Sequence, residues 1–552
     1  MFARNRVYSF FIYIVICMAV FWPTASLAVA AEDFQAAFIE QLELRPAKHL
    51  GIEQHGWDAD RIDEILSRLY HENGLQPLWI ANNGPGERAN EIFNALKSSD
   101  AHGLNPERYL IDKAEKYWDS KDAVGLVRLD ILLSLGLRGY VADMMEGRIE
   151  PRKVDPKLFA SARDVEIDIQ AIRERVLSTT DMSTFLNELI PPFHQYPKLQ
   201  KALKKYRQIR AKGGWEPIPV GKVLKPYMED ERVSLIRKRL AITADLKSLD
   251  LEGSLYDNDV VEAVKNFQSR HALEIDGVIG KNTLSAMNVP VEKRIRQIII
   301  NMERYRWLKR QVEGRMIVVN IAGFRAAGVN PIKGELEIVM PVIVGKEYHK
   351  TPVFGNMIKY VEFNPYWNIP PSIARNEMLP KLKKNRFYLK ERNIRVFESW
   401  NPGAKELDST AIGWQHVGRR DIGRFKLRQD PGPKNALGTV KFVFPNRFNV
   451  YLHDTPSHGL FSERKRTFSH GCIRVSRPAE LASYILGGEE GGWGLARVKE
   501  IIKTGKRKIV RLKSPLPIYI LYRTVIVDPE NNEIIFRSDV YGRDALLEKA
   551  LF

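Results

Sequence analysis

The chain has 552 residues, of which 44% are hydrophobic and 28% are charged, and its formal net charge at pH 7 is +18. The length allows about three domains, and the composition is typical of a globular chain with buried cores. The charge names no partner by itself, because nucleic acid, an anionic membrane surface, an acidic polymer or plain solvent would each suit a basic surface.

The first 30 residues have the layout of a signal peptide. Arg4 and Arg6 precede an apolar run from Val7 to Trp22, Pro23 ends the run, and Ala28-Val29-Ala30 provides a cleavage site of small residues. We therefore expect export to the periplasm, with an uncleaved inner-membrane anchor as the alternative. An exported chain is not expected to meet nucleic acid, so we expect no nucleic-acid partner.

Export also bears on whether the cysteines can form a disulfide. Cys17 lies in the signal segment, so cleavage leaves Cys472 as the single thiol of the chain, and this thiol has no internal disulfide partner. A free thiol in an oxidising compartment is either buried or used. His470, Gly471 and Arg474 are poor neighbours for an apolar core, which favours a used thiol over a buried one.

The mature chain is predicted to be a multidomain α+β protein. Residues 31–230 are predicted to form a helical scaffold domain, with a strongly apolar core helix from Val127 to Gly147. Residues 231–292 are predicted to form a small helical module, residues 312–515 a mostly β domain, and residues 516–552 a C-terminal hairpin extension. The apolar alternation of the third region predicts its strands.

The helical module resembles the three-helix peptidoglycan-binding family. Its features are Phe267-Gln268 near the end of a helix, a turn at Asp276-Gly277, and then Gly280 and Thr283. His271 follows the first helix and is expected to be a solvated surface histidine.

Residues 365–433 interrupt the strands of the third region. They are rich in Pro, Trp, Asn and Arg, and they predict an irregular capping insertion with one short helix from Ile373 to Leu382. Tyr366, Trp367 and Trp414 could stack on glycan or peptide, although core aromatics fit the pattern at least as well.

The chemistry of the chain is concentrated in two short stretches. In an extended segment from Asn449, Tyr451 and His453 share a face, and Leu452 points into the core. Cys472 follows 19 residues after His453, and an extended segment there would place Arg474 on the same face as the thiol.

These residues suit nucleophilic acyl transfer. A histidine next to a thiol lowers its pKa and takes its proton, and the thiolate attacks. Gly471 allows a sharp turn, so the N–H groups of Gly471 and Cys472 could face a developing oxyanion. Arg474 offers a fixed fork for a substrate carboxylate. The residues alone do not decide whether His453 or His470 is the base, although His453 can approach from a neighbouring strand.

The two stretches, YLHDTP and SHGCIRV with 15 residues between His453 and Ser469, resemble the signature of the YkuD-type L,D-transpeptidases. The order of helical scaffold, peptidoglycan-binding module and capped catalytic domain is similar to that of the large Gram-negative subgroup. VGKEYHKTPVF and NPYWNIPPSIARNEMLP also look like segments of that subgroup.

This resemblance implies roles for seven residues. Cys472 would be the nucleophile, His453 its base, and His470 and Gly471 helpers near the oxyanion. Arg474, Tyr451 and Asp454 would contact substrate; Asp454 stands where the family uses a main-chain carbonyl after the base, and its side chain could orient His453 instead.

The resemblance also implies the substrates. The enzyme would take the acyl group of a peptidoglycan tetrapeptide stem, release the terminal D-Ala, and give the acyl group to an amine of another stem, a lipoprotein or a D-amino acid. Carbapenem-type β-lactams would acylate Cys472, and no metal or organic cofactor would be needed.

Three alternatives remain open at the level of sequence. The same site could use water as the acceptor and act as an L,D-carboxypeptidase. A zinc hydrolase could use His453, His458, His470 and Cys472, although this spacing matches no known zinc motif. A non-catalytic wall-binding scaffold would need only the helical parts.

Overall fold

The computed structural model describes residues 24–50, 57–81, 84–156, 169–247, 250–308, 310, 314–330, 335–528 and 531–552. Residues 1–23, which make up most of the predicted signal peptide and include Cys17, lie outside the described residues. Pro529 and Glu530, at the tip of the predicted C-terminal hairpin, also lie outside them. In the part of the chain that is described, no helix is both long and apolar enough to span a bilayer.

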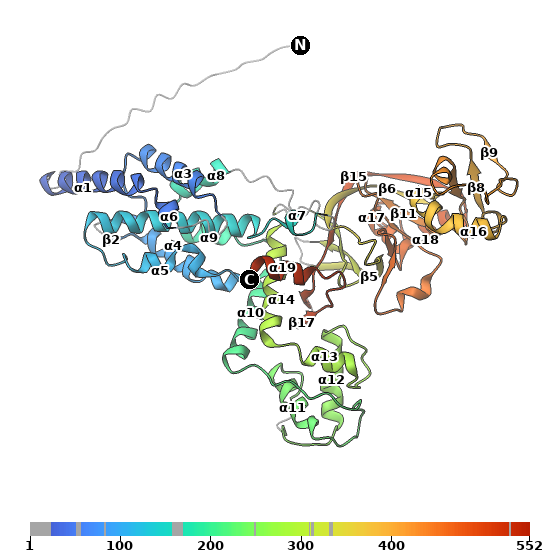
Figure 1. The fold of residues 1–552 in the computed structure, drawn as a ribbon, viewed down its shortest axis with the longest axis horizontal. Coiled ribbons are helices and arrows are strands. Elements are labelled where there is room, and N and C mark those ends of the chain that lie inside the picture. Colours follow the sequence, from blue (N-terminus) through green and yellow to red (C-terminus); the bar gives the residue numbers. More distant parts are fainter. Residues whose placement is uncertain are drawn as a thin grey trace, which may run out of the picture. The chain divides into compact units, whose positions relative to one another are not determined.

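The chain divides into two compact units, and the first contains residues 1–100, 105–140 and 170–187. It is almost entirely helical, as the predicted scaffold domain should be. The predicted core helix is α6 (Ala123–Glu146), most of which belongs to this unit (Figure 1). Its other elements are α1 (Thr24–Glu43), α2 (Pro46–His49), α3 (Ala59–Glu72), β1 (Ile80–Ala81), β2 (Gly84–Pro85), α4 (Glu87–Lys97), η3 (Pro106–Tyr109), α5 (Ile111–Glu115), α8 (Ile169–Ser178) and, up to residue 187, α9 (Met182–Glu188).

The second unit begins earlier in the sequence than the predicted boundary at residue 230. Helix α10 (Gln195–Ala211) was expected in the scaffold, but it packs on α14 (Val291–Arg306) within the second unit. Tyr196, Leu199, Leu203 and Tyr206 form its apolar stripe, and all four are buried in one core with residues of α14 and of the C-terminal hairpin. The helical character of residues 31–230 was predicted, but local periodicity does not show which core an apolar stripe joins.

The small module consists of α11 (Arg232–Ile242), α12 (Asn258–Arg270) and α13 (Lys281–Met287). Gln268 explains the sequence pattern, because its amide donates to Asp276 Oδ1 at 2.8 Å and accepts from the Gly277 N–H at 2.9 Å. Gly277 has φ +69°, which favours glycine. The prediction for His271 is wrong. This histidine is buried and stacks on Phe267 at 3.8 Å between ring centroids, and its burial lowers its pKa.

A nine-stranded mixed sheet forms the centre of the predicted β domain, in the order β13-β5-β14-β12-β11-β6-β15-β3-β4, and a further pairing of β4 with β5 closes it on itself. Its strands are β3 (Met316–Asn320), β4 (Arg325–Asn330), β5 (Glu335–Gly345), β6 (Phe354–Phe363), β11 (Val440–Val443), β12 (Leu452–His453), β13 (Thr467–Ser469), β14 (Ile473–Val475) and β15 (Lys508–Leu521). The confirmed fold class is therefore multidomain α+β, with a β-rich domain after the helical parts.

The predicted boundary between residues 515 and 516 falls inside a strand. β15 pairs with β6 from Lys508 to Arg511 and from Leu516 to Ile520, and with β3 from Ile518 to Leu521, so residues 516–521 belong to the nine-stranded sheet. Beyond it, β16 (Val525–Val527) and β17 (Ile534–Phe536) form a hairpin, and α19 (Arg543–Leu551) ends the chain. Pro515 lies at an irregularity of β15 between Arg511 and Leu516, and Pro517 is in register opposite Met357 of β6.

Helices α17 (Pro478–Ile485) and α18 (Leu495–Lys503) bury side chains in the same hydrophobic core as one face of this sheet. That core includes Val361, Phe442, Leu452 and Ile473, and each of these four is fully buried. Burial of this apolar face fixes which residues of each strand remain on the other face.

The capping insertion is more regular than the sequence predicted. It contains a four-stranded sheet in the order β7-β10-β8-β9, and the predicted short helix is interrupted by one π-helical turn, η4 (Ala374–Met378). Trp414 is 2% exposed in the insertion's own core, so it is a core aromatic and not a stacking platform. The elements are β7 (Trp367–Asn368), α15 (Pro371–Ile373), α16 (Leu379–Lys384), η5 (Lys390–Arg392), β8 (Ile394–Phe397), β9 (Glu406–Leu407), η6 (Asp421–Arg424) and β10 (Lys426–Gln429).

Candidate active site

The parallel pairing of β12 with β14 brings the two predicted stretches together. Leu452 lies opposite Ile473, and His453 lies opposite Arg474. Cys472 comes one residue before β14, so on the neighbouring strand it lies opposite Tyr451, two residues from the position opposite His453. Because alternate residues of a strand share a face, Tyr451, His453, Cys472 and Arg474 all lie on the face opposite the apolar core.

This face carries a row of polar residues across four adjacent strands. Glu362 of β6 lies opposite Lys441 of β11, Lys441 opposite His453, and His453 opposite Arg474. The next row is the buried apolar one formed by Val361, Phe442, Leu452 and Ile473. The register that buries the second row therefore fixes the first row as a line of charged and titratable groups.

The turn before Cys472 is held by two hydroxyl groups. Gly471 has φ +110°, a conformation that other residues rarely adopt. Ser469 Oγ spans the turn, donating to the Cys472 carbonyl and accepting from the Gly471 N–H at 3.1 Å. Thr351 Oγ1 donates to the Gly471 carbonyl at 2.9 Å and accepts from the Gly345 N–H at 2.9 Å.

A residue of the C-terminal segment supports this second clamp. The Tyr541 hydroxyl donates to the Gly345 carbonyl at 2.6 Å and accepts from the Thr351 N–H at 3.3 Å. Sequence reasoning missed both Thr351 and Tyr541. Thr351 belongs to the stretch VGKEYHKTPVF, but no local pattern connects Tyr541 to a turn 70 residues earlier in the chain.

The occupied Gly471 N–H corrects the predicted oxyanion site. We expected the N–H groups of Gly471 and Cys472 to be available together, but Ser469 Oγ accepts the bond from Gly471. Within the described residues, no hydrogen bond is formed by the Cys472 N–H, so this group is the free donor of the pair.

Cys472 is half-buried, and its thiol points to the Asn449 carbonyl, with Sγ 3.7 Å from the oxygen. Burial raises the pKa of the thiol, because it disfavours the charged form. The Tyr451 N–H and hydroxyl and the cations of Lys441 and Arg474 act in the opposite direction. The resting group is therefore a neutral thiol in surroundings that contain donors and cations for its thiolate.

His453 is 5% exposed, and its ring orientation is fixed by the main chain. Nδ1 lies 2.5 Å from the Asp454 carbonyl, which can only accept, so Nδ1 carries the proton and Nε2 keeps a free lone pair. Burial and the nearby Arg474 lower the pKa of His453 to about 3. The imidazole is thus neutral and in the tautomer that can accept a proton at Nε2.

Asp454 differs from its predicted role. It is 4% exposed; Oδ2 accepts from the Thr439 N–H and hydroxyl, both at 2.8 Å, and Oδ1 accepts from the Thr455 N–H at 2.7 Å. His458 Nε2 lies 3.5 Å from Oδ1. Asp454 therefore orients His453 through its main-chain carbonyl and not its side chain, and the satisfied, buried carboxylate is not placed to contact substrate.

His470 lies in quite different surroundings. Its Nε2 is hydrogen-bonded to Glu377 of the capping insertion, and the two side chains are 30% and 43% exposed. The ring lies 5.0 Å from that of His349. Because His470 contacts the insertion, its ring links the Cys472 turn to the cap.

Arg474 and Tyr451 have the placement that the sequence predicted for them. The half-buried Arg474 has no ion-pair partner among the described residues, and its Nε forms no hydrogen bond there. Burial lowers the pKa of its guanidinium, and the Cys472 thiolate opposes that shift. Tyr451 lies with its ring 5.5 Å from that of His453.

Lys441 is a further residue of the site that sequence reasoning missed. Its Nζ lies 4.2 Å from the centre of the Tyr451 ring, and burial lowers its pKa, opposed by Glu362 and Cys472. The alternation of residues 440–443 already indicated that Lys441 lies on the face opposite the core. Only the strand register shows that it lies opposite His453.

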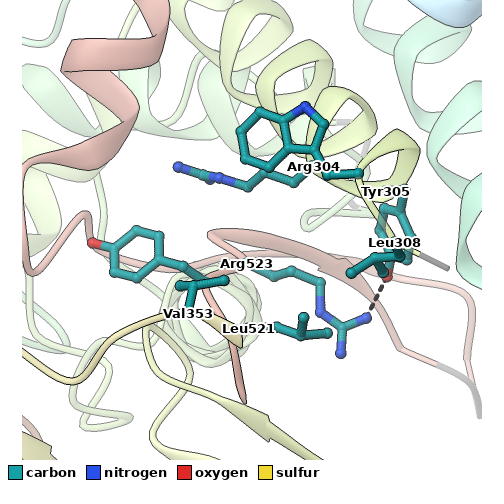
Figure 2. A pocket seen from close by; sticks show the side chains of 8 residues that line it. Arg304, Tyr305, Leu308, Val353, Leu521 and Arg523 are labelled. Carbon is teal, nitrogen blue, oxygen red and sulfur yellow. Dashed lines mark hydrogen bonds between the residues drawn. The ribbon is translucent and has the colours of Figure 1, made fainter. Parts of the chain in front are cut away.

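The small cavity in Figure 2 lies apart from these residues. It has a volume of about 20 Å³, room for about one water molecule, and is lined by Arg304, Val353 and Leu521 among others, with Arg523 hydrogen-bonded to Tyr305. Over the described ranges, no three His, Cys, Asp or Glu side chains are grouped closely enough to hold a metal ion. The geometry therefore gives the zinc alternative no support.

Three family models match the chain. Residues 314–509 match the YkuD family, described as the L,D-transpeptidase catalytic domain, and residues 64–203 match the scaffold domain family. Residues 229–287 match the family described as "Putative peptidoglycan binding domain".

A curated protein of Haemophilus influenzae, named "Putative L,D-transpeptidase", is 31% identical over 267 residues. The match covers 48% of this chain and 52% of that protein, so the chain spans about half the length of the relative it matches.

Two solved structures are also similar, an L,D-transpeptidase from Xylanimonas cellulosilytica (15% identity, TM-score 0.18) and one from Stackebrandtia nassauensis (13% identity, TM-score 0.20). The matches cover 55% of this chain and 100% and 97% of those chains. Since both TM-scores are low, the comparison rests on the family models and the curated relative, by which residues 314–509 are similar to the L,D-transpeptidase catalytic domain of the YkuD family and two earlier parts of the chain to the scaffold and peptidoglycan-binding families.

Proposed function

We propose that the chain is a periplasmic L,D-transpeptidase that acts on the stem peptides of peptidoglycan through a Cys472 acyl-enzyme. The observation that supports this most directly is the neutral His453, with Nδ1–H held by the Asp454 carbonyl and Nε2 free, on the strand beside Cys472. This is the arrangement that a base for a neutral thiol requires.

In the acylation step, His453 Nε2 takes the Sγ proton as Sγ attacks the carbonyl carbon that joins the L-centre of the third residue to the terminal D-Ala. The oxyanion forms next to the free Cys472 N–H. The carbon–nitrogen bond then breaks, the proton on His453 passes to the leaving amine, and D-Ala departs, which leaves a thioester on Cys472.

In the second step, an acceptor amine attacks the thioester carbonyl. His453 removes a proton from that amine, the carbon–sulfur bond breaks, and the proton returns to the Cys472 thiol. The proposed acceptor is a side-chain amine of a second stem, which gives a 3-3 cross-link; a lipoprotein lysine or a D-amino acid would use the same chemistry. Arg474 is proposed to hold a substrate carboxylate, because no ion partner for it occurs in the described chain.

The test is incubation of the purified chain with a disaccharide-tetrapeptide, followed by mass analysis of the products. We expect a cross-linked dimer and free D-Ala from the wild type and neither from Cys472→Ala. A trimmed monomer without dimer would show hydrolysis instead, and product from Cys472→Ala would overturn the assignment of the nucleophile.

Acylation by a carbapenem tests independently whether Cys472 is the reactive nucleophile. The strained lactam carbonyl should accept the Cys472 Sγ, so the intact mass of the wild type should rise by one inhibitor mass while that of Cys472→Ala stays unchanged. An equal adduct on both proteins would place the reactive group elsewhere.

A further inference from the structure

A second polar cavity lies far in sequence from Cys472, between α10, the helical module and the C-terminal hairpin. Its volume is about 510 Å³, and we call it the basic pocket. The cations that line it are Lys198, Lys201 and Lys205 of α10 and Arg270 of α12. Nothing in the proposed acyl transfer uses them.

Among the described residues, no partner carboxylate balances the positive charges of these three lysines. They follow each other at intervals of three and four residues, so they share one face of α10. In the described part of the chain, none of the three is ion-paired. Arg270, by contrast, is paired with Asp245, whose side chain is 4% exposed, so this carboxylate is already neutralised. Glu533 is the other carboxylate on the lining, and the three free ammonium groups outnumber it.

The walls of the pocket are built before any ligand arrives. The Gln195 side chain fixes α10 to β16, donating to the Val527 carbonyl at 2.7 Å and accepting from its N–H at 2.8 Å. Tyr206 of α10 packs edge-on against Phe536 of β17 at 5.5 Å, and His271 of the module stacks on the same ring at 5.5 Å. Packing and hydrogen bonds thus hold the three wall segments together, so the lysines line the pocket without any rearrangement of these segments.

We propose that the basic pocket is a second binding subsite for the peptidoglycan strand, which holds the free carboxylates of a stem peptide other than the one at Cys472. This rests on the proposed function, since it assumes the same polymer. Lysine ammonium groups suit carboxylates as point charges, and Asn531 and Asn532 add amide side chains to the same lining. A polymer held at both places gains effective concentration at the thiol, whereas a single soluble stem gains nothing.

The experiment compares two matched double variants of α10. Lys201→Gln/Lys205→Gln removes two exposed lysines of the pocket, and Lys204→Gln/Lys212→Gln removes two exposed lysines of the same helix and its C-cap that do not line it. Both are made in the full chain with Cys472→Ala, and binding to purified sacculi freed of phosphate polymers is measured by co-sedimentation. We expect the pocket double to weaken binding about five- to tenfold and the control double to leave it within about twofold.

Amidation of the sacculus carboxylates identifies the chemical group. It should weaken the chain with intact lysines by the same factor and abolish the difference between the two doubles. If the two doubles weaken binding equally, general charge attraction explains the result and the proposal is overturned. The proposal also fails if neither double changes binding, or if amidated sacculi bind as well as native ones.

Turnover of the soluble disaccharide-tetrapeptide separates this proposal from the proposed function. With Cys472 present, the pocket double should process the soluble fragment at the wild-type rate and intact sacculi more slowly. No turnover of the fragment by any form would overturn the proposed function. Equal losses on fragment and sacculi would show that the lysines act on the thiol site and not on a second subsite.

Discussion

The two histidines near Cys472 belong to two regions of contrasting construction. His453 lies on the closed sheet, in a polar row whose register is fixed by the buried apolar row beside it. His470 lies on an exposed turn and meets a glutamate of the capping insertion. The first has a fixed tautomer and a strongly lowered pKa, and the second is hydrogen-bonded to a partly exposed side chain of the cap.

The contrast indicates how one site can combine accurate proton transfer with access for a bulky polymer. A base must keep its geometry within a fraction of an ångström, and strands held on both sides provide that. In the proposed function a bulky substrate has to pass the cap, and a contact between partly exposed side chains is weak enough to break. The following predictions test this division of roles.

Removal of the sheet histidine should have the largest effect. We expect His453→Ala to lower kcat for tetrapeptide transfer by about 10²–10⁴-fold, the usual contribution of a general base, and His470→Ala to lower it less than about tenfold. Steady-state kinetics with a soluble donor measures both. If the two losses were equal, or if His470→Ala were the more damaging, the assignment of the base would be reversed.

The pH dependence of thiol chemistry should follow the raised pKa of Cys472. The pKa of the Cys472 thiol is raised above its ordinary value of 9.0, so the reactive thiolate is a minor species whose fraction, and with it the rate of iodoacetamide alkylation, should rise about tenfold per pH unit without levelling off below pH 9. The pKa of His453 is about 3, so kcat/KM should show no His453 limb between about pH 5 and 7. A plateau in alkylation below pH 8 would instead indicate a resting thiolate.

Loss of the Lys441 charge should lower kcat by less than loss of His453, which lies opposite it in the polar row. Lys441→Met keeps most of the stem and removes a charge that favours the thiolate, so the pKa of Cys472 should rise further and kcat should fall about three- to tenfold. Arg507→Met is the matched control, because this arginine pairs with the Glu362 carboxylate of the same row. An unchanged alkylation profile in Lys441→Met would show that Lys441 does not act on the thiol.

The contact between the cap and the turn should matter least. Glu377→Gln keeps the shape and removes the charge, and we expect about a two- to threefold change in KM for a large muropeptide with little change in kcat. A double-mutant cycle with His470→Ala should show that the two changes are not additive. Additive effects would mean that the two residues act separately, and a kcat loss like that of His453→Ala would place the cap contact in the chemistry.

Much of this fold could be predicted locally. The helices α3, α6 and α12 follow from apolar spacing, and the strands around Leu452 and Ile473 follow from alternation. Predictions failed where a residue's environment comes from distant chain. His271 looks solvated in the sequence, but Phe267 and Phe536 enclose it, and α10 joins the core of the second unit because α14 and the C-terminal hairpin meet its apolar stripe.

The sequence by itself determined the chemical parts: a single thiol after Ser-His-Gly, a histidine 19 residues earlier, and an arginine two residues later. It could do so because residue type, spacing and alternation are local properties. Only the tertiary structure decided that the Asp454 carbonyl and not its carboxylate orients His453, that Ser469 occupies the Gly471 N–H, and that Lys441 joins the row. Hydrogen-bond partners and cross-strand neighbours depend on register and turn geometry, and these are fixed by what the other strands bury.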